Sequence, residues 1–210
     1  LFAYLAGSVS FTANPSITPL DADRPTTNDT LACSWTASGD TTQQNVTWYR
    51  NGESFLNETG LAASQSVIGD GNTTRGEIWN CSVRMTNGTD TILAYSNVTI
   101  KNARPTKPIM INASGNDIGN ITNVTEDIPN IFNLSSTDPD GDRLTYGSWD
   151  ELPSGSSLNS TTGKFTWTPD NENVDVNITF YAKDNQTSFL NDNLLVIFTM
   201  QYINDNPEFI

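Results

Sequence analysis

The sequence predicts an all-β protein made of two tandem β-sandwiches that are preceded by an extra N-terminal strand. Turn-forming residues recur about every 8–12 residues, as they do in sandwich domains. The segments between the turns are rich in Thr, Val, Ile and aromatic residues and lack a strong helical period. The length of 210 residues suits two domains of about 100 residues each better than one small sandwich.

Composition supports folded domains and excludes several classes of function. Apolar residues make up 36% of the chain and aromatic residues 10%, which is enough for two modest cores. The formal net charge of −14 makes nucleic acid and anionic membranes unfavourable partners. The chain has no histidine, which excludes Ser-His-Asp and Cys-His catalysis and the usual zinc sites. No apolar run approaches the ~20 residues that span a bilayer. We therefore expect no enzymatic activity, no nucleic-acid partner and no membrane span.

Residues 1–14 form an apolar segment that we assign to neither sandwich. One face of its period-two pattern carries Leu1, Ala3, Leu5, Gly7, Val9, Phe11 and Ala13. Residues 15–19 already supply a first strand for the first sandwich, and a free apolar strand has to pair with something. The segment is either the last strand of a preceding domain, the ordinary first strand, or a donor strand that inserts into a neighbouring copy.

The segment Leu194–Met200 carries apolar residues at both odd-numbered and even-numbered positions, so both faces of the expected strand are apolar. This pattern predicts a last strand that is covered on both faces. It makes the second sandwich a candidate acceptor for the inserted strand, with the first sandwich as the alternative.

Alternating segments mark the first sandwich, which we place at residues 15–102. They cover residues 29–37, 45–52, 76–83 and 92–100. The order Cys33, Trp48, Cys81 has the spacing of an immunoglobulin-like sandwich, in which the two cysteines link the sheets and the tryptophan packs on the bridge. Trp79 stands where such domains usually carry a corner tyrosine, so we expect the corner to be built differently. The phrases Leu-Ala-Cys-Ser-Trp, Val-Thr-Trp-Tyr-Arg-Asn-Gly and Ile-Trp-Asn-Cys-Ser-Val resemble Ig-like repeats of prokaryotic, especially archaeal, surface proteins.

Cys33 and Cys81 are the two cysteines of the chain. Two well-separated cysteines suggest one disulfide and therefore an oxidising, extracellular location. The alternative is a pair of buried thiols in a cytosolic protein. The chain begins at Leu1 rather than Met, so we expect a processed mature protein that has lost a signal peptide, or a fragment.

A stiff, Pro-containing linker at residues 103–108 leads to a second sandwich at residues 109–210. Its ordered motifs include Asp138-Pro-Asp-Gly-Asp142, Thr162-Gly-Lys-Phe-Thr-Trp167 and Asn204-Asp-Asn-Pro207. This set resembles the cadherin-like, Ig-type domain of dystroglycan-type and many bacterial and archaeal surface proteins. The resemblance implies a stalk, adhesin or extracellular scaffold rather than an enzyme.

Four aspartates of the second sandwich are candidate metal ligands. Asp138, Asp140 and Asp142 share one tight loop, and Asp184 follows a strand. Carboxylate oxygens at such spacing suit Ca²⁺, which takes six to eight oxygen ligands. The cadherin-like resemblance also implies Ca²⁺ binding through aspartates near domain junctions. The alternative is that Asp-Pro-Asp-Gly simply forms a good turn.

Asparagine gives the strongest compositional signal. Fourteen of the 25 asparagines begin an Asn-x-Ser/Thr triplet, where chance would give about five or six. These candidate glycan acceptors are Asn28, Asn45, Asn57, Asn72, Asn80, Asn87, Asn97, Asn112, Asn120, Asn123, Asn133, Asn159, Asn177 and Asn185. Side chains alternate along a strand, so apolar neighbours on both sides of an acceptor such as Asn133 predict that it points outward. The alternative is an Asn/Thr-rich protein whose triplets are never modified.

From these features we expect a secreted cell-surface protein that is a structural subunit of a glycosylated fibril or pilus-like filament. Its partner would be copies of itself, joined by insertion of the N-terminal strand. One alternative is a stalk or adhesin fragment of a large tandem-domain surface protein. Another is a Ca²⁺-dependent carbohydrate-binding module that recognises surface glycans. N-linked glycans are the expected attached groups, with Ca²⁺ as an open candidate and no other cofactor.

Overall fold

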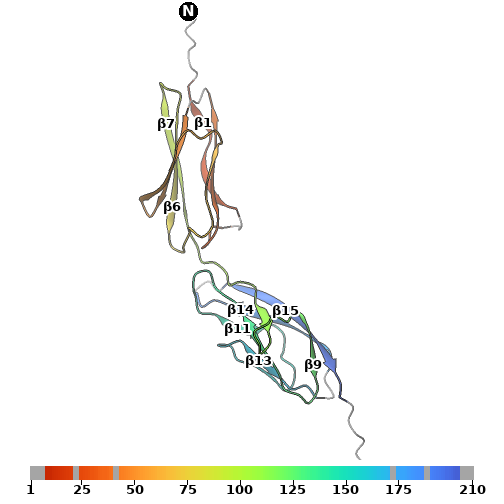
Figure 1. The fold of residues 1–210 in the computed structure, drawn as a ribbon. Helices are drawn as coiled ribbons and strands as arrows, with labels where there is room; N and C mark the ends of the chain where they lie inside the picture. The colour runs from red at the N-terminus through yellow and green to blue at the C-terminus, as the bar shows by residue number, and fades with distance from the viewer. Residues whose placement is uncertain (1–7, 21–23, 40–42, 171–173, 187–189, 204–210) are drawn as a thin grey trace, which may run out of the picture. The chain divides into compact units, whose positions relative to one another are not determined.

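The computed structural model describes residues 8–20, 24–39, 43–170, 174–186 and 190–203, and these contain strands, turns and bends. The chain divides into two compact units, Leu1–Ala103 (unit 1) and Arg104–Ile210 (unit 2). Each unit consists of two β-sheets with buried apolar side chains between them (Figure 1). The protein is therefore all-β, as the sequence predicts.

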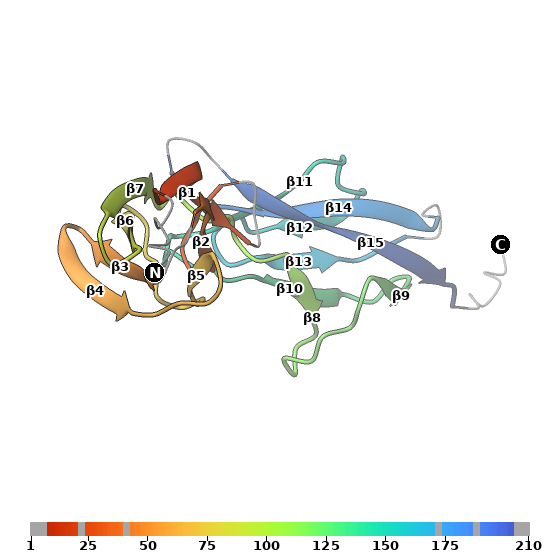
Figure 2. The same cartoon turned by 90° about the horizontal axis from the view of Figure 1, so that it is seen from above.

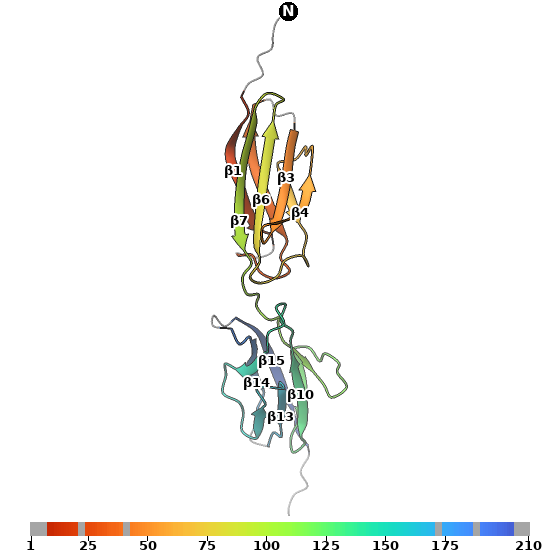
Figure 3. The ribbon, with the colours of Figure 1, turned by 90° about the vertical axis from the view of Figure 1, so that its left-hand side faces the viewer.

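Unit 1 has a three-stranded sheet in the order β1-β2-β5 and a four-stranded sheet in the order β4-β3-β6-β7. Figure 3 shows the four-stranded sheet. Its strands are β1 (Ser10–Pro19), β2 (Leu31–Ser38), β3 (Gln43–Arg50), β4 (Glu53–Glu58), β5 (Gln65–Ile68), β6 (Ile78–Thr86) and β7 (Thr91–Thr99). The alternating burial of β3 and β6 puts every second side chain into the core, which is why these segments form half-exposed strands.

A disulfide joins Cys33 on β2 to Cys81 on β6 and so links the two sheets. Trp48 pairs directly with Cys81 across β3 and β6 and is fully buried. The corner differs from the usual tyrosine corner, as expected: the indole N–H of the buried Trp79 donates to Glu77 at 2.9 Å. This bond satisfies the polar atom of a side chain that would otherwise be buried unpaired.

The predicted boundary between residues 14 and 15 falls inside one strand. β1 runs from Ser10 through Pro15 to Pro19 and pairs with β2 of the same unit. Its register shifts between Phe11 and Ala13 and again before Ser16, and an irregularity of this kind tolerates a proline that cannot donate to the ladder. The segment is therefore partly the ordinary first strand, which was one of the alternatives.

The predicted donor-strand residues accordingly fall into two groups. Val9 is buried in the unit 1 core, Phe11 packs against that core, and Ala13 pairs with Thr36 on β2. These three residues serve their own sandwich rather than a neighbouring one. The other four, Leu1, Ala3, Leu5 and Gly7, lie outside the described residues.

The segment predicted as a linker is packed onto the structure at both ends. Ala103 is buried, and the division between the units follows it directly. Thr106 already belongs to unit 2, because its N–H donates to the carbonyl of Thr137 at 2.8 Å and its carbonyl accepts the Ser136 hydroxyl at 2.6 Å. The described start of unit 2 thus lies within residues 103–108.

Unit 2 has two four-stranded sheets, in the orders β12-β13-β10-β8 and β11-β14-β15-β9 (Figure 2). Its strands are β8 (Ile109–Ile111), β9 (Ile121–Thr125), β10 (Asn130–Ser135), β11 (Thr145–Ser148), β12 (Ser156–Leu158), β13 (Lys164–Trp167), β14 (Val176–Lys183) and β15 (Asn191–Gln201). β9 pairs with β15 in parallel, and the other pairs are antiparallel. In the core, the ring centroid of Phe198 lies 5.6 Å from that of Phe165 and 5.6 Å from that of Trp167.

Candidate functional site

The candidate glycan acceptors lie on the surface with one exception. Nine are exposed: Asn28, Asn57, Asn72, Asn97, Asn120, Asn123, Asn159, Asn177 and Asn185. Four are half-buried: Asn45, Asn80, Asn112 and Asn133. On the strands, the outward direction follows from the pleat, because the flanking side chains enter the core.

Four acceptors of unit 1 share the outer face of a single sheet. Asn57, Asn45, Asn80 and Asn97 lie one on each of β4, β3, β6 and β7, and Asn80 pairs directly with Asn97. No acceptor lies on β1, β2 or β5. The strands of the opposite sheet of this sandwich therefore carry no attachment point for sugar.

Asn87 is the exception, since its side chain is only 9% exposed. Its Oδ1 accepts the backbone N–H groups of Thr89 and Asp90 at 3.0 and 2.7 Å and the Thr89 hydroxyl at 2.9 Å. These bonds hold the turn that joins β6 to β7. Asn87 therefore has a structural role that the triplet pattern alone did not indicate.

Three of the four predicted metal ligands come together in unit 2. Asp138, Asp142 and Asp184 each offer a carboxylate oxygen, and these oxygens lie within 4.8 Å of one another. Asp184 is 1% exposed, and its Oδ1 accepts the N–H groups of Gln186 and Leu190, both at 3.2 Å. Gln186 also donates to Asp142 at 2.7 Å, which ties the loop after β14 to the aspartate loop.

Asp138 carries the least satisfied oxygen of this cluster. Its Oδ1 accepts the N–H groups of Asp140 and Asp142 at 2.8 and 3.3 Å. Its Oδ2 is buried and has no hydrogen-bond partner among the described residues. Burial raises the pKa of Asp138 above its ordinary value, the two backbone hydrogen bonds oppose this, and the nearby negative charges of Asp142 and Asp140 add to the increase.

This arrangement fits a hard cation better than it fits a bare turn. Three converging carboxylates repel one another unless a cation or a proton compensates them, and oxygen ligands are those that Ca²⁺ takes. Asp138 and Asp142 also line a surface hollow of about 440 Å³, which gives an ion access. Asp140 donates its backbone N–H to Asp138, and its carboxylate lies outside the group of three.

A further buried carboxylate was not found by sequence reasoning. Glu126 follows β9 and is 2% exposed, its Oε1 accepts the N–H of Ile203, and its Oε2 has no partner among the described residues. The position could have been found from the sequence, because Glu126 continues the inward alternation of Val124 on β9.

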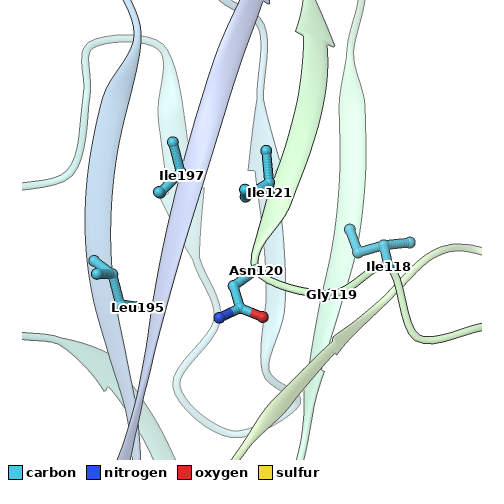
Figure 4. A pocket seen from close by; sticks show the side chains of 6 residues that line it. All are labelled: Ile118, Gly119, Asn120, Ile121, Leu195 and Ile197. Carbon is cyan, nitrogen blue, oxygen red and sulfur yellow. The ribbon is translucent and has the colours of Figure 1, made fainter.

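The two faces of β15 differ, which corrects the expectation that both are covered. Leu194, Val196 and Phe198 are buried, whereas Leu195 is 47% exposed. Leu195 and Ile197 line a groove of about 420 Å³ together with Ile118, Gly119, Asn120 and Ile121 at the start of β9 (Figure 4). β9 ends its sheet, so its outer edge has no strand partner among the described residues. The outer face of β15 is thus available to another segment.

An aromatic pair with one exposed and one half-buried member lies on the same sheet, nearer β11. Trp149 follows β11 and is 59% exposed, and its ring centroid lies 4.6 Å from that of Tyr181 on β14. The indole N–H donates to Asn193 on β15 at 2.9 Å. Tyr181 lies so close over Gly147 that a Cβ there would be 2.2 Å from its ring. Sequence analysis did not indicate this pair, because its members lie just after β11 and on β14, two paired strands that are far apart along the chain.

Comparison with known proteins assigns similarity to part of the chain. Residues 111–199 match a family model described as "Putative Ig domain". Ig-like domains are typical of extracellular adhesion and stalk proteins and are typically structural rather than enzymatic. No curated protein matches the chain.

Several solved structures are similar to the chain at low TM-scores. A nucleoside hydrolase-related hypothetical protein from Saccharophagus degradans is 24% identical over 48% of this chain and 26% of its own, with a TM-score of 0.38. Drosophila OTK extracellular domains 3–5 are 10% identical over 92% of this chain and 65% of their own, with a TM-score of 0.35. Mouse cadherin-23 EC22-24 is 14% identical over 90% and 67%, with a TM-score of 0.39. The chain thus spans about a quarter of the first structure and about two thirds of the others, and no functional residue is transferred from them.

Among the described residues, no helix has the length and apolar character needed to cross a bilayer.

Proposed function

We propose that this protein is an N-glycosylated structural module of an extracellular, self-assembling fibril. The excess of Asn-x-Ser/Thr triplets and the surface position of thirteen of the fourteen acceptors support glycosylation. The disulfide in unit 1 supports an oxidising location. The Ig-like similarity of unit 2 supports a structural rather than catalytic role.

The observation that carries the assembly mechanism is the half-covered strand β15 beside the edge strand β9. An added strand at the edge of β9 would place its apolar side chains beside Ile121, at the rim of the groove that Leu195 and Ile197 also line. Residues 1–7 have the alternation for this, with Leu1, Ala3 and Leu5 on one face. The occupant that we propose is this segment of a second copy. Because Val9–Ala13 serve their own sandwich, the donor is shorter than residues 1–13.

Electrostatics favours the same segment. The chain carries a formal net charge of −14, so most surfaces of two copies repel each other. Residues 1–20 contain no charged side chain and can approach an acidic copy without that cost. The main-chain ladder would supply affinity, and the apolar side chains would fix the register.

Deleting residues 1–7 tests this mechanism, with velocity sedimentation and negative-stain imaging as the readouts. The full chain is expected to form fibrils, and the shortened chain is expected to stay monomeric while unit 1 melts at an unchanged temperature. Leu195→Asp, on the acceptor side, should likewise abolish fibril formation. Val67→Asp, at an exposed position of unit 1, is the matched control and should still form fibrils. A full chain that remains monomeric would refute the fibril and leave the stalk or adhesin and the carbohydrate-binding alternatives. A glycan on Asn120 in assembled material would contradict this acceptor, because Asn120 lines the groove.

We further propose that Asp138, Asp142 and Asp184 hold a Ca²⁺ ion that stabilises unit 2. The orphaned Oδ2 of Asp138 supports this, because a buried carboxylate oxygen without a partner costs free energy that a cation would recover. The ion would connect the loop after β10 to the loop after β14. Its role would be structural, since it would fix two loops at one end of the sandwich.

A further inference from the structure

The outer face of the sheet β11-β14-β15-β9 places one glycan acceptor beside the aromatic pair. Asn177 and Tyr181 lie on the same face of β14, about 13 Å apart at ~3.3 Å per residue. Thr179 lies between them and completes the triplet of Asn177. The backbone N–H of Trp149 donates to the carbonyl of Thr179 at 2.9 Å, so Trp149 is the direct cross-strand neighbour of that triplet.

The aromatic pair is held rigidly although Trp149 is exposed. Trp149 is fixed at its backbone by Thr179 and at its indole N–H by Asn193, and its ring rests against Tyr181. Tyr181 in turn lies on Gly147, where any larger residue would displace it. Contacts within the unit already order these two side chains, so binding a ligand would not require a further loss of their conformational entropy. An ordered, partly exposed aromatic surface of this kind suits a flat apolar ligand face.

We propose that Trp149 and Tyr181 form a stacking platform for the N-glycan attached to Asn177 of the same chain. A pyranose ring has one face of C–H groups that packs against an aromatic ring, while its hydroxyl groups stay in water. The attachment point lies on the same face and strand, so tethering keeps the sugar at a high effective concentration. Asn177 is exposed, and its side chain points to the same side of the sheet as the platform.

This inference gives the glycan a function in the fold. The sugar would cover an aromatic surface that would otherwise be open to non-specific contacts between copies. It rests on the proposed glycosylation but not on the proposed strand insertion. The aromatic pair lies on β14 and just after β11, but its acceptor lies beside the groove, because Asn177 pairs directly with Ile197 across β14 and β15.

Tryptophan fluorescence provides a direct test, because Trp149 is the exposed member of the five tryptophans. Trp35, Trp48, Trp79 and Trp167 are at most 3% exposed. Acrylamide quenching, with a neutral quencher that the acidic surface does not repel, therefore reports on Trp149. The full chain would be made in a host that adds N-glycans and in one that does not, and peptide mass spectrometry would record which acceptors are occupied.

The glycan-free chain is expected to show a quenchable component that the Trp149→Phe variant lacks. In the glycosylated chain this component should fall to the level of Trp149→Phe. Thr179→Val removes the triplet but keeps the carbonyl of residue 179 that accepts the Trp149 N–H, and it should restore quenching. Thr179→Ser keeps the triplet and should remain protected, as should Asn133→Gln, which removes an acceptor on the other sheet.

Three results would overturn the proposal, each at a different step. Full quenching of a chain whose Asn177 carries a glycan would refute the stacking while leaving glycosylation intact. Protection that persists in Thr179→Val would show that something other than this glycan covers Trp149. If Asn177 alone carried no sugar, the glycan proposed to stack on Trp149 would not exist. If no acceptor carried sugar, the proposed glycosylation itself would be refuted.

Discussion

Replacing Cys33 and Cys81 together with alanine is expected to lower the melting temperature of unit 1 strongly and to leave unit 2 unchanged. The disulfide closes a loop with a sequence separation of 48 residues. In the chain-entropy model, a loop of this length contributes about 4 kcal/mol at 25 °C by restricting the unfolded chain. For a domain of about 100 residues, this corresponds to a shift of roughly 16–30 °C. The loss of two buried sulfur atoms beside Trp48 adds to the effect.

Differential scanning calorimetry of the full chain measures this with an internal control. Both cysteines of the sequence lie in unit 1, so the transition of unit 2 should not move. Phe198→Leu, in the core of unit 2, identifies the other transition by lowering it alone. Reduction of the wild-type disulfide without substitution separates the cross-link from the lost sulfur volume. Equal shifts of both transitions, or no shift in unit 1, would refute the reasoning.

Two other perturbations test the aspartate cluster and the buried acceptor. Ca²⁺ at a hundredfold excess over its Kd should stabilise unit 2 by about 2.7 kcal/mol relative to the chain in chelator, as measured by thermal melting. Asp138→Asn should abolish this difference, whereas Asp140→Asn should largely keep it. The metal assignment fails if chelation leaves the wild-type transition where it was. Asn87→Ala should destabilise unit 1 by about 1–3 kcal/mol in urea titrations, because three donors lose their acceptor. Asn97→Ala, at an exposed strand position, should change the free energy of unfolding by no more than about 0.5 kcal/mol. Equal effects of the two alanine substitutions would contradict the structural role of Asn87.

Local sequence pattern was sufficient for much of the first sandwich. The segments predicted at residues 29–37, 45–52, 76–83 and 92–100 correspond to β2, β3, β6 and β7. The spacing of Cys33, Trp48 and Cys81 gave the link between the sheets and the side chain beside it. These features were predictable because the pleat repeats every two residues, so burial of every second side chain appears in the sequence as alternating apolar and polar residues.

The same rule misassigned the segment around Pro15. Residues 15–19 were assigned as the first strand of the sandwich, so residues 1–14 were assigned to a separate strand. In the structure the register shifts of β1 absorb the proline, and Val9 and Phe11 enter the core of their own unit. Such an irregularity depends on how β2 pairs with β1, and the sequence of either strand alone does not specify this pairing.

The sequence by itself determined the class of fold, the bridge between the cysteines and the outward direction of most acceptor asparagines, because each depends on neighbours a few residues away or on a known spacing. Only the tertiary structure decided which distant side chains meet. It brought Asp184 to Asp138 and Asp142 but left Asp140 aside, and it placed Trp149 beside the triplet of Asn177. It also left one face of β15 open. The physical reason is that strand order and register set these contacts, and both are chosen by packing of the whole sandwich rather than by any single segment.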